Sequence, residues 1–261
     1  MNILARIVAD KKKEVANRKA LFPETYWEQS PLFERPTVSL KNSLLDKAVG
    51  IIAEHKRRSP SKAVINQSGS VARIAEAYTQ AGVGGISVLT DSKYFGGSLE
   101  DLVQARAVTS LPLLRKEFII DPYQLIEAKA HGADAILLIA ALLERTEIKK
   151  LSEAAQSLGL EVLLEVHNQE ELEKALMPSL DLLGVNNRDL KAFQVSLDTS
   201  KTLAAKIPDE FVKVSESGIS SPEAVRELKP YGYRGFLIGE HFMRADNIQT
   251  FTHKFIQACQ D

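Results

Sequence analysis

Eight short apolar runs alternate with amphipathic segments over most of the chain. The runs start near residues 50, 84, 111, 134, 160, 181, 211 and 234, roughly 20 to 30 residues apart, which is the spacing of strand and helix units in parallel α/β proteins. Helices are therefore expected at residues 71–81, 99–108, 122–131, 145–158, 169–176, 199–206 and 222–228. Pro122 and Pro222 suit a first helical turn, and Gly82, Gly132 and Gly159 suit the left-handed residue that ends a helix.

Five of the apolar runs stop at a charged or amide side chain. If the runs are parallel strands of one closed barrel, these polar groups all emerge at one mouth, the end where such barrels carry their chemistry. The pattern therefore predicts an enzyme. The side chains concerned are Glu54 and Lys56 after the first run, then Lys116, Glu165, Asn186 and Glu216 after four later ones.

An open, doubly wound sheet is the alternative for eight such units. With strands about 4.8 Å apart, its first and seventh strands would lie roughly 29 Å from each other, so Glu54 and Glu216 could not meet. An open sheet of this kind usually carries a glycine-rich dinucleotide fingerprint, and no G-x-G-x-x-G occurs here. We therefore predict an α/β fold with a single (β/α)8 TIM barrel at residues 49–261.

Residues 1–48 read differently from the rest of the chain. Ile3, Ile7 and Val15 recur at helical spacing around the run Lys11 to Lys13, and prolines at positions 23, 31 and 36 then interrupt the chain. This segment is predicted to be a helical extension packed on the barrel.

Each strand-end charge has an ordinary explanation when it is taken alone. Side chains alternate along a strand, so Glu54 and Lys56 share a face and could form a structural ion pair, while His55 points away and is expected to pack between strand and helix. Lys116 could likewise be a solvated charge. Several like and unlike charges in one mouth, however, shift one another's pKa values, and such clusters favour a catalytic site.

A phosphate site is predicted beside these charges. Ser217-Gly218 follows the seventh run and Gly239-Glu240 follows the eighth, and backbone N–H groups of these two loops bind phosphate in many barrels. Tight turns are the alternative reading of the glycines. The carboxylate of Glu240 would repel a phosphate, so the backbone is expected to form the cradle. The long basic loop at 57–69 suggests a lid over an anion, or else an ordinary solvated loop.

Composition and motifs exclude several classes of protein. The 33 basic and 34 acidic residues nearly balance, so neither nucleic acid nor a membrane surface is an expected partner. The longest apolar run, residues 135–143, is too short to cross a bilayer and is predicted to be a buried strand. The N-terminus does not resemble a signal peptide, which favours a cytoplasmic location. Cys259 is the single cysteine and the histidines lack ligand spacing, so no metal and no cofactor are expected.

The motifs together resemble those of indole-3-glycerol phosphate synthases over essentially the whole chain. Two departures from the family pattern are Ala63, where glycine is usual, and Glu117, where aspartate is frequent. The motifs are I-I-A-E-x-K-R-x-S-P-S from Ile51, K-Y-F-G-G-S from Lys93, L-R-K-x-F-I from Leu114, E-V-H from Glu165, G-V-N-N-R-D-L from Gly184, S-E-S-G-I from Ser215 and F-L-I-G from Phe236.

The resemblance implies cyclisation of 1-(2-carboxyphenylamino)-1-deoxyribulose 5-phosphate to indole-3-glycerol phosphate, with loss of carbon dioxide and water, in tryptophan biosynthesis. It implies Lys116 as general acid on the ketone oxygen, Lys56 as anchor of the substrate carboxylate and Glu165 as general base in the dehydration. Which lysine protonates the departing hydroxyl stays open.

The resemblance also implies the surroundings of these three side chains. Core packing is an alternative for Phe118 and Leu137, because apolar side chains fill such barrels. Hydrogen bonds to the substrate are expected from Glu54, Asn186 and Glu216, an apolar slot from Phe95, Phe118 and Leu137, edge support from Arg188, and phosphate binding from Ser59, Ser217, Gly218, Gly239 and the backbone beside Glu240.

Two rival functions remain at this point. A phosphoribosyl anthranilate isomerase could share the barrel and the phosphate loops, but it would need no pair of lysines at the mouth. A catalytically silent phosphate-binding barrel is the second rival. We expect a monomer, with association with other tryptophan-pathway enzymes left open.

Overall fold

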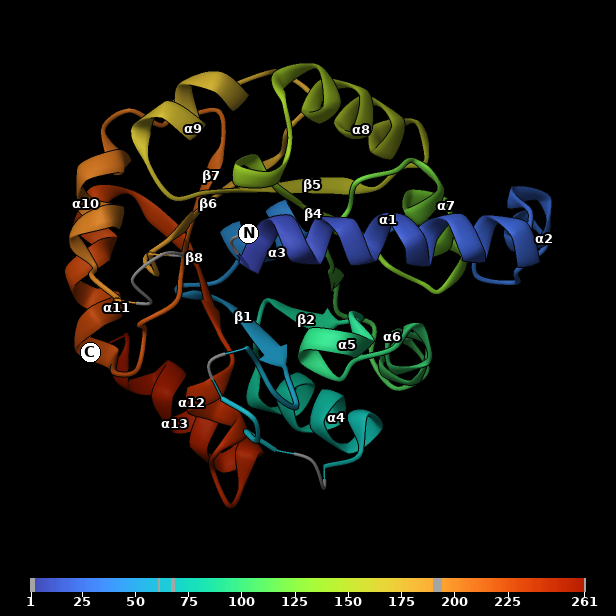
Figure 1. Ribbon diagram of the computed structural model, residues 1–261. Coiled ribbons are helices and arrows are strands. Elements are labelled where there is room, and N and C mark those ends of the chain that lie inside the picture. The colour runs from blue at the N-terminus through green and yellow to red at the C-terminus, as the bar shows by residue number, and fades with distance from the viewer. Residues whose placement is uncertain (1–2, 61, 67–68, 190–193, 261) are drawn as a thin grey trace.

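The computed structural model describes residues 3–60, 62–66, 69–189 and 194–260, and its centre is a closed barrel of eight parallel strands. Each strand pairs with the next, and β8 closes the ring on β1 (Figure 1). Every strand begins within two residues of its predicted start, which confirms the TIM barrel. The strands are β1 (Gly50–His55), β2 (Gly85–Leu89), β3 (Leu113–Lys116), β4 (Ala135–Ile139), β5 (Glu161–Val166), β6 (Leu182–Asn186), β7 (Val212–Glu216) and β8 (Tyr233–Ile238).

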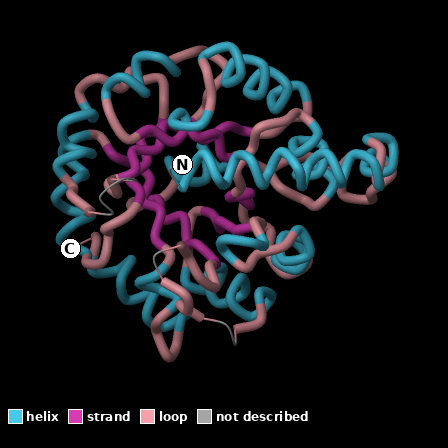
Figure 2. The backbone as a smooth tube through the Cα atoms, viewed as in Figure 1, coloured by secondary structure: helices cyan, strands magenta, loops and turns pink. Residues whose placement is uncertain are grey.

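Helices surround the strands as an outer ring (Figure 2). All seven helices expected between the strands are present, with ends within two residues of the predicted ones, although Pro122 stands just before α7 rather than inside it. An eighth long helix, α13, packs against α4 and completes the ring. The long outer helices are α4 (Val71–Ala81), α6 (Leu99–Arg106), α7 (Tyr123–Ala130), α8 (Arg145–Ser157), α9 (Gln169–Ala175), α10 (Asp198–Ala204), α11 (Pro222–Leu228) and α13 (Ile248–Ala258), and the short helices are α5 (Ser92–Phe95), η1 (Ala140–Leu142), η2 (Lys229–Tyr231) and α12 (Glu240–Met243).

The apolar run at 135–143 is only partly a strand. Strand β4 ends at Ile139 and the chain continues into the 3-10 turn η1, which differs from the single buried strand that we predicted. The ammonium of Lys174 on α9 donates hydrogen bonds to the backbone oxygens of Ala140 and Leu143, at 2.7 and 2.8 Å. These bonds satisfy carbonyl groups that a buried turn would otherwise leave without partners.

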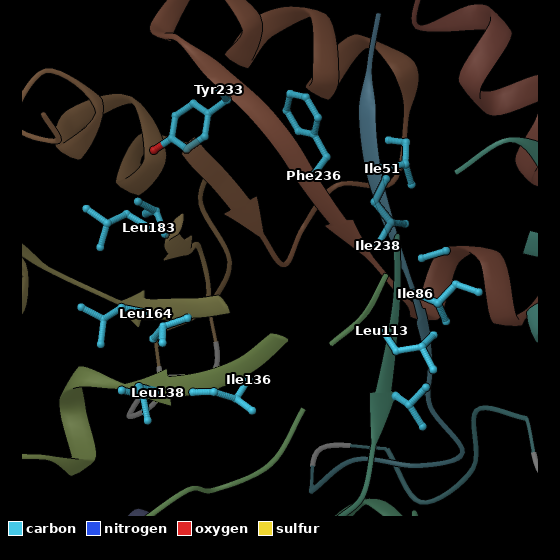
Figure 3. Packing of buried hydrophobic residues seen from close by; sticks show 14 of the residues in the cluster. Ile51, Ile86, Leu113, Ile136, Leu138, Leu164, Leu183, Tyr233, Phe236 and Ile238 are labelled. Carbon is cyan, nitrogen blue, oxygen red and sulfur yellow. The ribbon is translucent and has the colours of Figure 1, made fainter. Parts of the chain in front are cut away.

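Alternation along the strands divides the buried side chains into two cores. Outward-facing side chains such as Ile51, Leu113 and Leu164 pack between the strands and the outer helices (Figure 3). Inward-facing ones such as Ile52, Leu114 and Leu163 fill the barrel interior. Strands buried on both faces read as continuous apolar runs, which is why the sequence shows runs rather than alternation.

The chain ahead of β1 contacts both ends of the barrel. It forms α1 (Ile3–Leu21), α2 (Glu24–Glu28) and α3 (Leu40–Leu45). Helix α3 places Leu40 and Leu44 in the interior core, where a Cβ on Gly85 would come within 2.5 Å of Leu40. Helix α1 lies across the ring of strands at the opposite end (Figure 1) and adds Ile7 to the same core. Among the described residues, no helix is long and apolar enough to span a membrane.

Candidate active site

A cavity of about 510 Å³ lies at the carboxyl ends of the strands, and every predicted site residue lines it. The inward positions of β1, β3, β5, β6 and β7 carry Leu, Ile or Val lower in the barrel, and the last inward position of each carries a polar side chain. The same alternation that fills the core therefore delivers the polar groups to one place. Ser61 and Leu190 of the family motifs, and residues 67 and 68 of the predicted lid, lie outside the described residues.

Lys116 is at the centre of the cluster. Its ammonium lies 3.2 Å from Oε2 of Glu165 and makes a short contact with Oε2 of Glu216. The exposed fraction of the Lys116 side chain is 14%, and those of the two carboxylates are 6% and 2%. One cation thus bridges two carboxylates that come from β5 and β7.

The cluster sets its own protonation states. Burial alone would lower the pKa of Lys116, but attraction to Glu216, Glu165 and Glu54 outweighs it and raises that pKa well above its usual value, so the ammonium form persists. Burial opposes ionisation of Glu165 as well, yet Lys116, His167 and a hydrogen bond from Asn186 lower its pKa. The site therefore holds an acid and an ionised base side by side.

Glu216 behaves differently from Glu165. Burial, together with the nearby carboxylates of Glu165 and Glu54, outweighs the effect of Lys116 and raises the pKa of Glu216 to about 7. Among the described residues, Oε1 of Glu216 has no hydrogen-bond partner. A Cβ on Gly184 of β6 would collide with that oxygen. Glycine at this strand position makes the room in which the Glu216 carboxylate lies.

Glu54 and Lys56 form a second ion pair at the mouth. The Nζ of Lys56 lies 2.5 Å from Oε1 of Glu54, and a Cβ on Gly239 would lie 2.5 Å from the same oxygen. His55 is 2% exposed and does not line the cavity. Burial and the charge of Arg57 lower the pKa of His55 to about 4, so it is a neutral packing residue.

Apolar side chains form one wall of the cavity. The rings of Phe95 and Phe118 have centroids 6.0 Å apart at an interplanar angle of 44°, and Leu137 lies in the lining beside them. Leu4 and Ile7 of α1 line the same cavity. The N-terminal extension therefore contributes to the wall, which the sequence pattern did not predict.

The loop after β7 turns at two residues that line the cavity. Ser217 and Gly218 both have left-handed backbones, with φ values of 66° and 78°. Asn187 holds the loop by donating a hydrogen bond to the backbone oxygen of Ser217 at 3.1 Å.

The carboxylate of Glu240, on the neighbouring loop after β8, is neutralised by two cations. Lys62 makes a short ion pair with it, and Arg244 lies 3.1 Å away. Gly239 directly precedes α12 and lines the cavity, as does Ser59. Lys62 and Arg244 were not singled out from the sequence, because only the fold brings them to Glu240.

His167 is a further neighbour of the cluster that the sequence reading did not single out. Its Nε2 lies 3.4 Å from Oε1 of Glu165. The sequence did contain a signal, because His167 stands two residues after Glu165. Side chains two residues apart at the end of a strand lie on the same side of the chain. Within the described ranges, no cluster of histidine, cysteine and carboxylate side chains has the geometry of a metal site.

Comparison with solved structures finds the same fold in other proteins. A thiamine phosphate pyrophosphorylase from Pyrococcus furiosus superimposes with a TM-score of 0.62 at 17% identity, covering 85% of this chain and 98% of that one. A mutant tryptophan synthase α-subunit from the same organism superimposes with a TM-score of 0.61 at 15% identity, covering 80% and 97%. Identities this low show a shared fold and nothing beyond it.

Comparison with sequences is more specific. A family model for indole-3-glycerol phosphate synthase matches residues 4–255. An indole-3-glycerol phosphate synthase of Bacteroides thetaiotaomicron is 44% identical over 259 residues, covering 99% of each chain. One from Polaromonas naphthalenivorans is 45% identical over 249 residues, covering 94% of this chain and 95% of that one. These matches extend from α1 to α13 and include every strand that lines the cavity, so the chain belongs to the indole-3-glycerol phosphate synthase family.

Proposed function

We propose that the cavity at the mouth of the barrel carries out the family reaction with Lys116 as general acid, Glu165 as general base and Lys56 as the anchor of the substrate carboxylate. The activity itself, that of a carboxy-lyase of tryptophan biosynthesis acting on a phosphorylated substrate, follows from family membership. The observation that carries the residue assignment is the ammonium of Lys116 held between two buried carboxylates in that cavity.

Ring closure is the first stage. The aryl carbon that bears the carboxylate attacks the ketone carbon, and the ketone oxygen needs a proton as its negative charge develops. Lys116 is suited to this role because its raised pKa keeps it protonated and because it projects into the cavity. Lys56, directly after β1, holds the substrate carboxylate until carbon dioxide leaves and the aromatic ring is restored.

Dehydration is the second stage. A hydroxyl group departs as water, and a proton is removed as the indole double bond forms. Glu165 accepts that proton, because its lowered pKa keeps it ionised and its carboxylate lines the cavity. The contact of 3.2 Å between Glu165 and Lys116 offers a route by which the proton returns to the lysine.

Binding groups lie around this centre. The aryl ring is placed in the slot of Phe95, Phe118 and Leu137, and Arg188 supports its edge. The phosphate is placed against the backbone of Ser217, Gly218 and Gly239, with Ser59 beside it. Glu54, Asn186 and Oε1 of Glu216 form hydrogen bonds with the sugar hydroxyls.

The test measures indole-3-glycerol phosphate and carbon dioxide in parallel. Lys116→Met and Glu165→Gln are each expected to lower kcat by about 100-fold or more, the usual contribution of a positioned acid or base. Circular dichroism checks that both variants fold. Normal turnover in a folded variant would overturn its assignment. Turnover of phosphoribosyl anthranilate without carbon dioxide release would instead support the isomerase alternative.

We also propose that the protein acts as a monomer. Its exposed large apolar side chains are distributed over separate elements, with Tyr26 on α2, Val64 after β1 and Phe251 on α13. A stable dimer interface needs one contiguous apolar surface, which single side chains on separate elements do not form. Sedimentation at micromolar concentration tests this, and a dimer mass would contradict it. A cytoplasmic location and association with other tryptophan-pathway enzymes remain predictions from the sequence.

A further inference from the structure

His167 is held in a fixed orientation at the end of β5. Its Nδ1 lies 3.1 Å from Oε2 of Glu171 on α9, and its backbone N–H donates to the same oxygen at 2.8 Å. The other carboxylate oxygen of Glu171 accepts a hydrogen bond from Asn168 at 2.9 Å. The exposed fraction of the His167 side chain is only 9%. The imidazole therefore has little freedom to turn away.

The second nitrogen of the fixed ring lies near the proposed base. Nε2 of His167 lies 3.4 Å from Oε1 of Glu165 and has no hydrogen-bond partner among the described residues. An ionised carboxylate only accepts hydrogen bonds, so Nδ1, which faces Glu171, carries a proton. A neutral ring would then direct the lone pair of Nε2 at an oxygen of Glu165. Two acceptors repel at this distance unless one of them is protonated.

We propose that His167 is a positioning residue that, as an imidazolium, keeps Glu165 ionised and directed into the cavity. The proposal rests on the role of Glu165 as general base. It places the Glu165 carboxylate between two cations, with Lys116 at Oε2 and His167 at Oε1. His167 does not line the cavity, so it acts through Glu165 and not on the substrate.

The charges around His167 are consistent with an imidazolium. Glu165 faces it from its own strand, Glu171 from α9 and Glu216 from β7, and all three are carboxyl groups. Burial alone would lower the pKa of His167, but the hydrogen bond to Glu171 and the attraction of these groups raise it above its usual value. In return, His167 is one of the groups that lower the pKa of Glu165.

The first experiment compares pH profiles of kcat. His167→Asn retains a donor near the position of Nδ1 for Glu171 but removes the cation beside Glu165. The acidic limb is expected to move up by about one pH unit, which lowers kcat about tenfold at a pH below both pKa values. KM should change less than about twofold, because His167 does not touch the substrate. A profile that superimposes on the wild-type profile would overturn the proposal.

Two further variants separate charge from hydrogen bonding and from burial. His167→Gln can direct an amide N–H at Glu165 but carries no charge. It should therefore restore the orientation of the Glu165 carboxylate, while the acidic limb returns only part of the way to its wild-type position. His131→Asn is the matched control, because His131 is half-buried and directly follows α7, away from the cavity. It should leave the profile unchanged. A shift of equal size in both asparagine variants would show a general structural effect and contradict the specific role.

A second experiment does not depend on turnover. Histidine NMR titration of the wild-type protein should show His167 with a pKa above its usual value, and Glu165→Gln should lower that pKa by about one unit. An unchanged pKa in Glu165→Gln would overturn the link between the two residues. Loss of turnover in Glu165→Gln tests the proposed function separately, so the two failures are distinguishable.

Discussion

The ammonium of Lys11 lies 3.1 Å from a carboxylate oxygen of Glu117, the residue directly after the proposed acid Lys116. It also lies 2.9 Å from Asp91 and 2.8 Å from Glu14, and its side chain is only 2% exposed. Burial opposes its charge, but Glu117 and Asp91 raise its pKa well above the usual value. Glu117 in turn accepts the backbone N–H of Phe118 at 2.8 Å. One lysine thus fastens α1 to the loops after β2 and β3.

Removal of this lysine should destabilise the fold. Lys11→Met removes the cation that the buried carboxylates of Asp91 and Glu117 share and leaves Glu117 with Arg115 alone, which costs about 3 to 5 kcal/mol of the free energy of unfolding. Urea denaturation measures the loss. Lys12→Met is the control, because Lys12 is exposed on the same helix and should change stability by less than about 0.5 kcal/mol. Equal stability of the two variants would show that the buried ion pairs contribute little.

Gly184 should tolerate no larger side chain. Gly184→Ala places a methyl group against Oε1 of Glu216, so the carboxylate must move away from Lys116. We expect kcat/KM to fall by about 10-fold to 100-fold, since small displacements of catalytic groups have effects of this size. The same clash should lower the free energy of unfolding of Gly184→Ala, and adding Glu216→Asp, which shortens the displaced side chain, should recover part of that loss. The idea fails if Gly184→Ala alone is fully active.

Stability should depend on pH through Glu216. Its pKa is raised to about 7 in the folded protein, whereas the usual value is 4.5. Between these two values the folded state retains a proton that the unfolded state has lost, so the free energy of unfolding falls as pH rises. Urea denaturation at pH 5 and pH 7 should show a smaller fall in Glu216→Gln than in the wild type. An identical fall in both proteins would count against the raised pKa.

The aromatic slot should affect binding more than chemistry. Phe95→Leu removes ring contacts with the aryl group of the substrate, and we expect KM to rise by about fivefold to tenfold, the effect of about 1 kcal/mol of lost aromatic contact. A smaller change in kcat should accompany it. Phe251→Leu is the control, because Phe251 is 38% exposed on α13 and outside the cavity. Similar KM values for Phe95→Leu and the wild type would remove Phe95 from the site.

Glu240 should weaken phosphate binding in the wild-type protein. Glu240→Gln removes a negative charge and releases Lys62 and Arg244 from their ion pairs. KM for the phosphorylated substrate is expected to fall by about threefold to tenfold at low salt, and the effect should shrink as salt screens the charges. Glu223→Gln is a matched control, since Glu223 is an exposed partner of Arg226 on α11. A rise in KM would mean that Glu240 itself organises the loop.

The barrel and its mouth could be predicted because both depend on local patterns. Apolar runs at regular spacing define the strands, and alternation places Glu54, Glu165 and Glu216 on inward positions once the ring is closed. The same reasoning failed for α13, although Asn247 caps it through a hydrogen bond to the N–H of Thr250. That helix follows the last strand. Helices were predicted only between successive strands, so the pattern did not predict a helix there.

Long-range partners could not be predicted in this way. Lys11 stands in a run of three lysines and has the sequence pattern of a solvated charge. Its burial depends on Asp91 and Glu117, which only the folded barrel brings beneath α1. The role of His167 could not be predicted for a similar reason. It depends on the contacts of the imidazole with Glu171 on the next helix and with Glu165.

The position of α1 has a practical consequence for joining this protein to another. Ile3 and Leu4 line the cavity, whereas α13 lies in the outer ring of helices (Figure 1). A polypeptide attached ahead of α1 would emerge beside the entrance through which substrate passes. One attached after α13 would leave from the outer surface. Affinity tags, reporters and second enzymes therefore belong at the carboxyl end.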